Sequence, residues 1–131
     1  MRTLEDIQGF LSQVGSWAAG REDVLAVALV GSYARGSARE DSDIDLLILC
    51  AAPGDLLADP SWMGQFGAVL RQQGEDYGKV TSLRAWYVDG REVEFGIASR
   101  IWAAHPLDDG TRRVIQDGMR VIFEREPVLP R

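Results

Sequence analysis

Residues 31–46 read GSYARGSAREDSDIDL and connect two apolar runs of the chain. The run before them, residues 24–30 (VLAVALV), and the run after them, residues 44–49, are each short enough to form a buried strand. The glycines and small polar residues between the runs predict a turn and a short connecting segment. Asp43 and Asp45 alternate with apolar residues, so a strand would carry both carboxylates on one face.

The Gly31-Ser32 pair has the features of an anion-binding turn. Glycine allows close approach of the backbone, free N–H groups at a helix start favour phosphate, and Ser32 adds a hydroxyl donor. Asp43 and Asp45 raise each other's pKa unless a cation lies between them, and Mg²⁺ is a hard cation that takes oxygen ligands. A phosphate turn beside a carboxylate metal site indicates nucleotide chemistry, in which the cation neutralises charge at the transferred phosphorus.

The rest of the chain predicts an α/β or α+β fold: a small mixed β-sheet with helices packed on one face. The spacing of apolar residues predicts helices at residues 4–17, at residues 62–70 (ending by Gly74) and at residues 109–117. Residues 51–60 are typical of a surface loop. Further strands are expected at residues 81–88, 91–97 and 119–123, and the Asp89-Gly90 pair predicts that the first two form a hairpin. Because the carboxylate face must admit a nucleotide, we expect the first two helices to pack on the opposite face.

A Gly-Ser pair followed after ten residues by Asp-x-Asp resembles the signature of the DNA polymerase β-type nucleotidyltransferase superfamily. The likeness is greatest to the small stand-alone bacterial members of this superfamily. The dense motif lies within residues 24–49, and the hairpin extends the resemblance more loosely. The resemblance implies a nucleotidyltransferase (polymerase β-like palm) fold and bound Mg²⁺. It also implies transfer of a nucleoside monophosphate, AMP from ATP, to a hydroxyl group with release of pyrophosphate.

The resemblance also implies a third metal-binding carboxylate on a later strand, which in this superfamily also acts as the base. Glu92 and Glu94 both face away from the apolar side of their strand, and we favour Glu94 because it lies between two apolar residues in mid-strand. The residues themselves do not fix the identity of the base. The expected catalytic and metal-binding residues are Asp43, Asp45 and Glu94, and the expected triphosphate-binding residues are Gly31, Ser32, Ser42 and Arg35.

Composition excludes several classes of protein. The chain has 131 residues with 14 basic and 20 acidic side chains, and a net charge of −6 disfavours binding of extended nucleic acid. An apolar share of 46% supports a real core, yet no apolar run reaches the roughly 20 residues that span a membrane. The acidic N-terminal segment does not resemble a signal peptide, and the single cysteine, Cys50, has no internal disulfide partner. We therefore expect one nucleotidyltransferase domain over residues 1–131, located in the cytoplasm.

The acceptor is not identified by the sequence, and it is either a small molecule or a protein. Antibiotic-modifying members of the superfamily carry a C-terminal helical domain that forms much of the acceptor site, whereas this sequence ends at Arg131 soon after its last expected strand. We therefore expect a homodimer or a helical partner protein to complete the site. Two alternatives are an antitoxin-type module, which adenylylates or simply binds a small helical toxin, and a nucleotide-binding pseudoenzyme.

Overall fold

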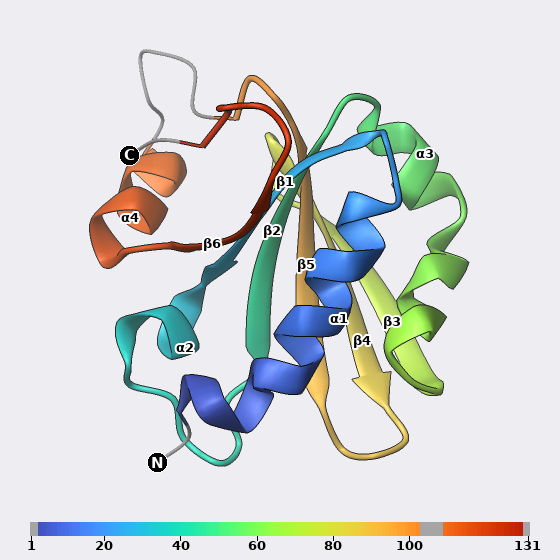
Figure 1. Cartoon of the computed structure of the whole chain (residues 1–131), viewed down its shortest axis with the longest axis vertical. Helices are drawn as coiled ribbons and strands as arrows, with labels where there is room; N and C mark the ends of the chain where they lie inside the picture. Colours follow the sequence, from blue (N-terminus) through green and yellow to red (C-terminus); the bar gives the residue numbers. More distant parts are fainter. Residues whose placement is uncertain (1–2, 103–108, 130–131) are drawn as a thin grey trace.

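The computed structural model describes residues 3–102 and 109–129, and these form a six-stranded sheet with helices around it (Figure 1). The strands lie in the order β3-β4-β5-β2-β1-β6. Their bounds are β1 (Val24–Val30), β2 (Ile44–Cys50), β3 (Val69–Asp76), β4 (Val80–Tyr87), β5 (Glu92–Ser99) and β6 (Arg120–Glu124). Strands β2 and β5 pair in parallel and the other neighbours pair antiparallel, so the predicted mixed sheet is confirmed.

The main core lies on the face of the sheet that carries the alternate apolar residues of β2 and β5. A short 3-10 turn, η1 (Leu4–Ile7), continues into α1 (Gln8–Ala19), which packs there as predicted. Helix α3 (Pro53–Ala58) and the 3-10 helix η2 (Pro60–Phe66) contribute to the same core. Phe95 of β5 lies at its centre, with the Trp62 ring 5.0 Å and the Phe66 ring 6.0 Å away between centroids. This aromatic cluster fixes the face on which β5 buries its apolar side chains.

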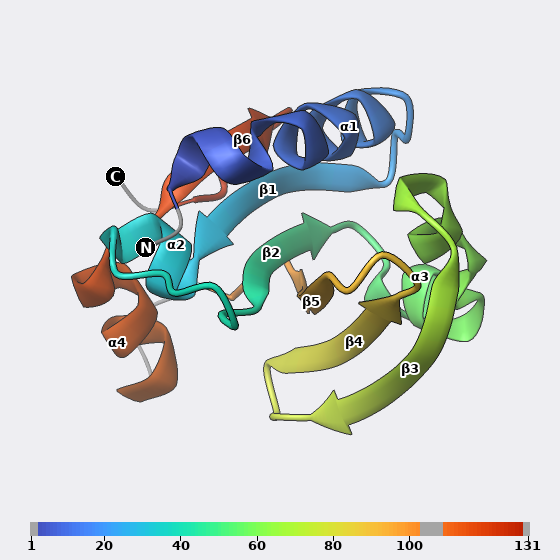
Figure 2. The ribbon, with the colours of Figure 1, turned by 90° about the horizontal axis from the view of Figure 1, so that it is seen from below.

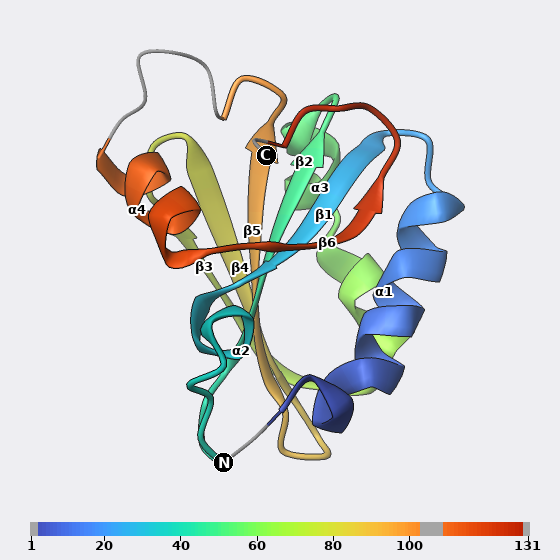
Figure 3. The same cartoon turned by 60° about the vertical axis from the view of Figure 1, so that its left-hand side comes forward.

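A second, smaller core covers part of the opposite face, where we expected no helix of this chain. Helix α4 (Asp109–Asp117) lies on the other side of the sheet from α1 (Figure 3). Leu47, Leu49 and Trp102 are buried there, and Val114 of α4 packs against them. The reason is that the face of β2 that carries Asp45 continues with two leucines, and these require cover from water. Helix α4 therefore leaves the carboxylates accessible but adds a wall beside them.

The helix expected at residues 62–70 is wrong. Residues 60–66 form η2, Gly67 has a positive φ of 149° that interrupts the helical geometry, and residues 69–76 form β3 at the edge of the sheet. Leu70, which completed the helical spacing, is 72% exposed. The spacing reflected one buried turn followed by an exposed strand, and this strand extends the sheet beyond β4, as Figure 2 shows. The loop expected at residues 51–60 likewise contains the short helix α3.

The predicted hairpin and last strand are confirmed. The Tyr87 N–H donates to the Arg91 carbonyl oxygen at 2.8 Å and closes the turn between β4 and β5. This turn sets the register that places Arg84 opposite Glu94. Strand β6 pairs with β1 at the other end of the sheet. Within residues 3–102 and 109–129, no helix is both long and apolar enough to cross a bilayer.

Candidate active site

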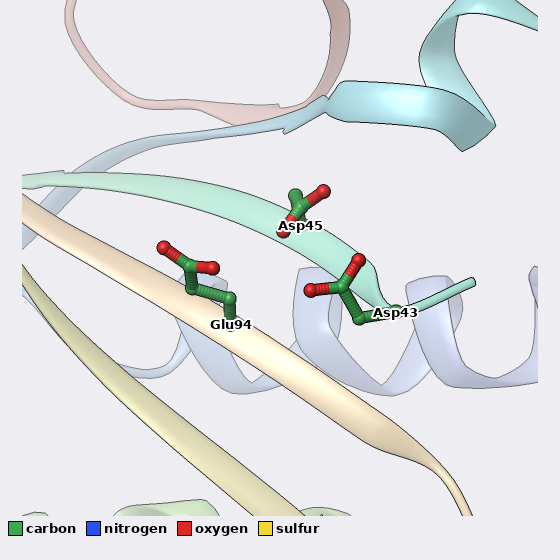
Figure 4. Close-up of side chains that lie close together, drawn as sticks. All are labelled: Asp43, Asp45 and Glu94. Carbon is green, nitrogen blue, oxygen red and sulfur yellow. The ribbon is translucent and has the colours of Figure 1, made fainter. Parts of the chain in front are cut away.

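Three carboxylates converge where β2 and β5 run side by side (Figure 4). The parallel pairing places Asp45 of β2 directly opposite Glu94 of β5, and Asp43 lies just before β2 begins. One oxygen of each of the three side chains lies within 4.8 Å of the others. Because successive side chains of a strand point to opposite faces, the register that buries the apolar neighbours of these acids also turns the acids toward one another.

Gly31 borders this cluster because β1 and β2 are antiparallel, with Val30 paired to Asp45. Helix α2 (Gly31–Arg35) begins immediately after β1. Gly31 has a φ of +74°, and a Cβ at this position would overlap the Asp45 carboxylate. The glycine is therefore required by the close approach of Asp45 as well as by its backbone conformation. The sequence argument assigned Gly31 to the phosphate alone and did not foresee this contact.

Asp45 lies in an environment that disfavours its charge. Burial, together with the nearby charges of Asp43 and Glu94, raises its pKa from 3.8 to about 7. Arg84 and Arg35 act in the opposite direction. A cation held among the carboxylates would favour ionised Asp45, so the electrostatics of the cluster suit a bound metal ion.

Arg84, on the neighbouring strand β4, is a site residue that the sequence argument missed. Its Nη1 lies 2.6 Å from Asp43 Oδ2, its Nη2 donates to Glu94 Oε2, and Nη1 also donates to Glu92. Burial lowers the pKa of Arg84, but its hydrogen bond to Asp43 and the charge of Glu94 raise it overall above its usual value. A permanent positive charge thus contacts two of the three converging carboxylates.

Glu94 and Glu92 are distinguished by their contacts. The buried Ser82 hydroxyl donates to Glu94 Oε1 at 2.9 Å, so Glu94 is held at one oxygen by Ser82 and at the other by Arg84. Glu92 pairs with Arg84 and does not join the group formed by Asp43, Asp45 and Glu94 in the described part of the chain. The structure therefore places Glu94, the favoured of the two glutamates, in the cluster.

A pocket of about 260 Å³ lies between the cluster and helix α4. Its polar lining includes Gly31, Arg35, Asp45 and Glu94, and its apolar lining includes Leu47, Val80, Trp102 and Val114. Arg35 Nη1 lies 3.7 Å from Asp117 Oδ2 of α4. The pocket thus joins carboxylates, the Arg35 and Arg113 side chains and an apolar wall, and its volume is slightly below the roughly 300–1,000 Å³ of small-ligand sites.

The two serines expected at the triphosphate lie outside this pocket lining. The Ser32 carbonyl accepts from the Ser37 N–H at 2.9 Å in the turn that follows α2. Ser42 Oγ accepts from the Arg39 N–H at 2.8 Å, and Ser42 lines a different hollow, near Glu92. A role for either hydroxyl in phosphate binding stays a prediction.

Carboxylates that converge beside a glycine at a helix start form an arrangement suited to a divalent cation and a phosphate group. Comparison with known sequences gives the family. Residues 14–121 match the nucleotidyltransferase domain family, and the chain belongs to that family. The resemblance that the Gly-Ser and Asp-x-Asp residues suggested is therefore confirmed.

One curated protein is similar to this chain in sequence, and two solved structures are similar to it in fold. The chain is similar to the protein adenylyltransferase MntA of Thermococcus cleftensis, with 42% identity over 48 residues, 37% of this chain and 48% of that protein. Its fold is similar to that of an aminoglycoside 6-adenyltransferase from Bacillus subtilis (TM-score 0.55, 15% identity, 68% of this chain and 33% of that one). It is also similar to Cid1 in complex with the UTP analogue UMPNPP (TM-score 0.52, 13% identity, 72% and 30%). The aligned part of this chain spans about half of the first relative and about a third of each solved chain.

Proposed function

We propose that this nucleotidyltransferase transfers AMP from ATP to a hydroxyl group and releases pyrophosphate. The observation that carries the proposal is the convergence of Asp43, Asp45 and Glu94 beside Gly31 and an adjoining pocket. The adenylyltransferase activity named for the similar MntA protein and for the similar Bacillus subtilis enzyme supports ATP as the donor. We further propose that residues 1–131 act as one domain and that the reaction takes place in the cytoplasm.

The three carboxylates would hold Mg²⁺. Their oxygen donors suit a hard cation, and the Arg84 guanidinium already contacts two of them as a positively charged group. Bound Mg²⁺ supplies charge neutralisation at the transferred phosphorus and at the pyrophosphate.

The other residues around the pocket have roles that follow from their positions. The N–H groups at the start of α2, next to Gly31, would donate to the triphosphate, and Ser32 would add its hydroxyl. Arg35 lines the pocket and would pair with a phosphate oxygen in place of Asp117. Glu94 is the base implied by the resemblance to the superfamily, and the Ser82 hydroxyl would orient its carboxylate.

We propose a protein hydroxyl as the acceptor, because the relative with 42% identity is named a protein adenylyltransferase. The acceptor side of the site would be completed by a helical partner protein or by a second copy of this chain. An antitoxin-type role, in which the chain modifies its partner, is one form of this proposal. In the binding-only and pseudoenzyme alternatives, the same pocket would hold ATP without turnover.

The test combines pyrophosphate release with transfer of label from α-³²P-ATP to proteins of a cell lysate. We expect Mg²⁺-dependent labelling of a protein band and stoichiometric pyrophosphate, both lost in Asp43→Asn and Glu94→Gln. Asp41→Asn, an exposed acid in the turn before β2, is the matched control and should retain both signals. Binding of Mg·ATP without pyrophosphate release in the presence of lysate would favour the binding-only alternatives. Equal labelling by all variants would contradict the assignment of the site.

A further inference from the structure

The Arg84 guanidinium uses the same carboxylates that would hold the metal. It lies 2.6 Å from Asp43 Oδ2 and donates to Glu94 Oε2. The second oxygen of Glu94 already accepts from Ser82. A divalent cation that binds Asp43 and Glu94 would therefore meet a competing positive charge at close range, and both cannot hold the same oxygen lone pairs at full strength.

Glu92 offers Arg84 a second position. It accepts from Nη1 of Arg84, is 36% exposed at its side chain, and lies opposite Trp86, one step along the strand face from Glu94. Because Glu92 is outside the converging group of described acids, its contact with Arg84 does not use the oxygens of Asp43 or Glu94 and is compatible with a metal ion bound to them. Arg84 thus has one partner that does not compete with the metal.

We propose that Arg84 is a built-in counter-cation that holds the metal-free carboxylates together and withdraws onto Glu92 when a divalent cation binds. This inference rests on the proposed metal site and adds a regulator of metal affinity to it. In the metal-free protein, Arg84 offsets the repulsion among Asp43, Asp45 and Glu94, which would otherwise spread the cluster. When a metal ion binds, Arg84 competes with it for Asp43 and Glu94. The contact with Glu92 lowers the free-energy cost of moving Arg84 away from these two carboxylates.

Manganese binding, followed by electron paramagnetic resonance without nucleotide, tests the proposal. We expect Arg84→Gln to bind Mn²⁺ about tenfold more tightly than the wild type, because two charge-assisted contacts no longer compete. Arg84→Lys retains the charge without the planar fork and should fall between the two proteins. Arg71→Gln is the matched control, since Arg71 on strand β3 hydrogen-bonds to Gln73 and stacks on Trp86, and its affinity should equal that of the wild type.

A double-mutant cycle tests the role of Glu92. Glu92→Gln should weaken Mn²⁺ binding about threefold in the wild type and change it little once Arg84→Gln is present, because the two residues act as a unit. A threefold loss in both backgrounds would show that Glu92 acts on the metal directly and would overturn its role as the second position of Arg84.

The outcomes separate the inference from the metal site beneath it. Wild-type Mn²⁺ binding with unchanged or weaker binding in folded Arg84→Gln and Arg84→Lys would overturn the counter-cation alone, since an arginine that merely supports the cluster gives that result. Failure of the wild type to bind Mn²⁺ would overturn the metal site and the inference together. Thermal unfolding gives a second readout: Arg84→Gln should melt below the wild type without metal and gain more from added Mn²⁺.

Discussion

Asp45→Asn should stabilise the metal-free protein at pH 8. The carboxylate is partly buried beside two other acids, and its pKa is raised from 3.8 to about 7. At pH 8 the wild type must keep a charge that its folded environment disfavours, whereas asparagine has nearly the same shape and no charge. Removal of a functional but destabilising charge is expected to increase stability while it abolishes metal binding.

The magnitude follows from the two pKa values. At 1.36 kcal/mol for each pKa unit, a rise from 3.8 to about 7 corresponds to about 4 kcal/mol. Solvent reaches part of the carboxylate and screens these interactions, so we expect a gain of about 2 kcal/mol. Below pH 3.8 Asp45 is protonated in both the folded and the unfolded protein, so its charge does not reduce the free energy of unfolding. As the pH rises toward 7 the unfolded protein ionises first, and the free energy of unfolding of the wild type falls. The advantage of Asp45→Asn should therefore grow between pH 4 and pH 7 and remain constant above that range.

Urea unfolding from pH 4 to pH 8.5 in the presence of a chelator measures this advantage. Asp41→Asn, which neutralises an exposed acid two residues before Asp43, is the control and should show no comparable gain. Added Mg²⁺ should stabilise the wild type and not Asp45→Asn, because the ion binds the folded cluster alone. Equal stability of wild type and Asp45→Asn at every pH would refute the electrostatic reasoning.

Three further predictions concern single positions. Gly31→Ala should destabilise the protein and weaken Mn²⁺ binding at least tenfold because its Cβ would displace Asp45, whereas Gly36→Ala, with a similar φ of +75° and open space around it, should cost about 1 kcal/mol and leave Mn²⁺ affinity intact. Urea unfolding with Mn²⁺ titration distinguishes the two variants. Cys50, whose pKa burial raises to about 12, should not react with a thiol reagent at pH 8 until the protein unfolds, and rapid labelling of the native state would contradict its burial. Phe95→Ala should cost about 3–5 kcal/mol because it empties the centre of the aromatic core, as measured by the urea midpoint.

The parts of the fold that the sequence predicted are those with a strong local pattern. Strand β1 is a continuous apolar run, β2 is apolar except for Asp45, and the Asp89-Gly90 turn identifies the hairpin. Strand β3 was missed because its residues are almost all exposed and show no alternation, so its pairing with β4 is a tertiary effect. The place of α4 also depends on tertiary structure, namely on the need to cover Leu47 and Leu49.

For the site, the sequence provided residue types but not the register between strands. Asp43 and Asp45 are close in the chain, and a preference for Glu94 over Glu92 rested on its apolar neighbours. Arg84 was missed although the turn holds a usable signal: when the strands are paired outward from Tyr87 and Arg91, Arg84 falls opposite Glu94. The contact of Gly31 with Asp45 required the antiparallel pairing of β1 with β2, which no local pattern reveals.

The parallel pairing of β2 with β5 has a consequence for the order of events in folding. Asp45 and Glu94 are 49 positions apart in the chain, so the intervening segment must close a long loop before β2 and β5 can pair. Closure of such a long loop is slow compared with the formation of the β4–β5 hairpin, which is a local event. Chelation by all three acids thus becomes available late, after the hairpin has docked on β2. Added metal ion should therefore slow unfolding much more than it accelerates refolding. The ion would stabilise the folded sheet without taking part in the folding nucleus.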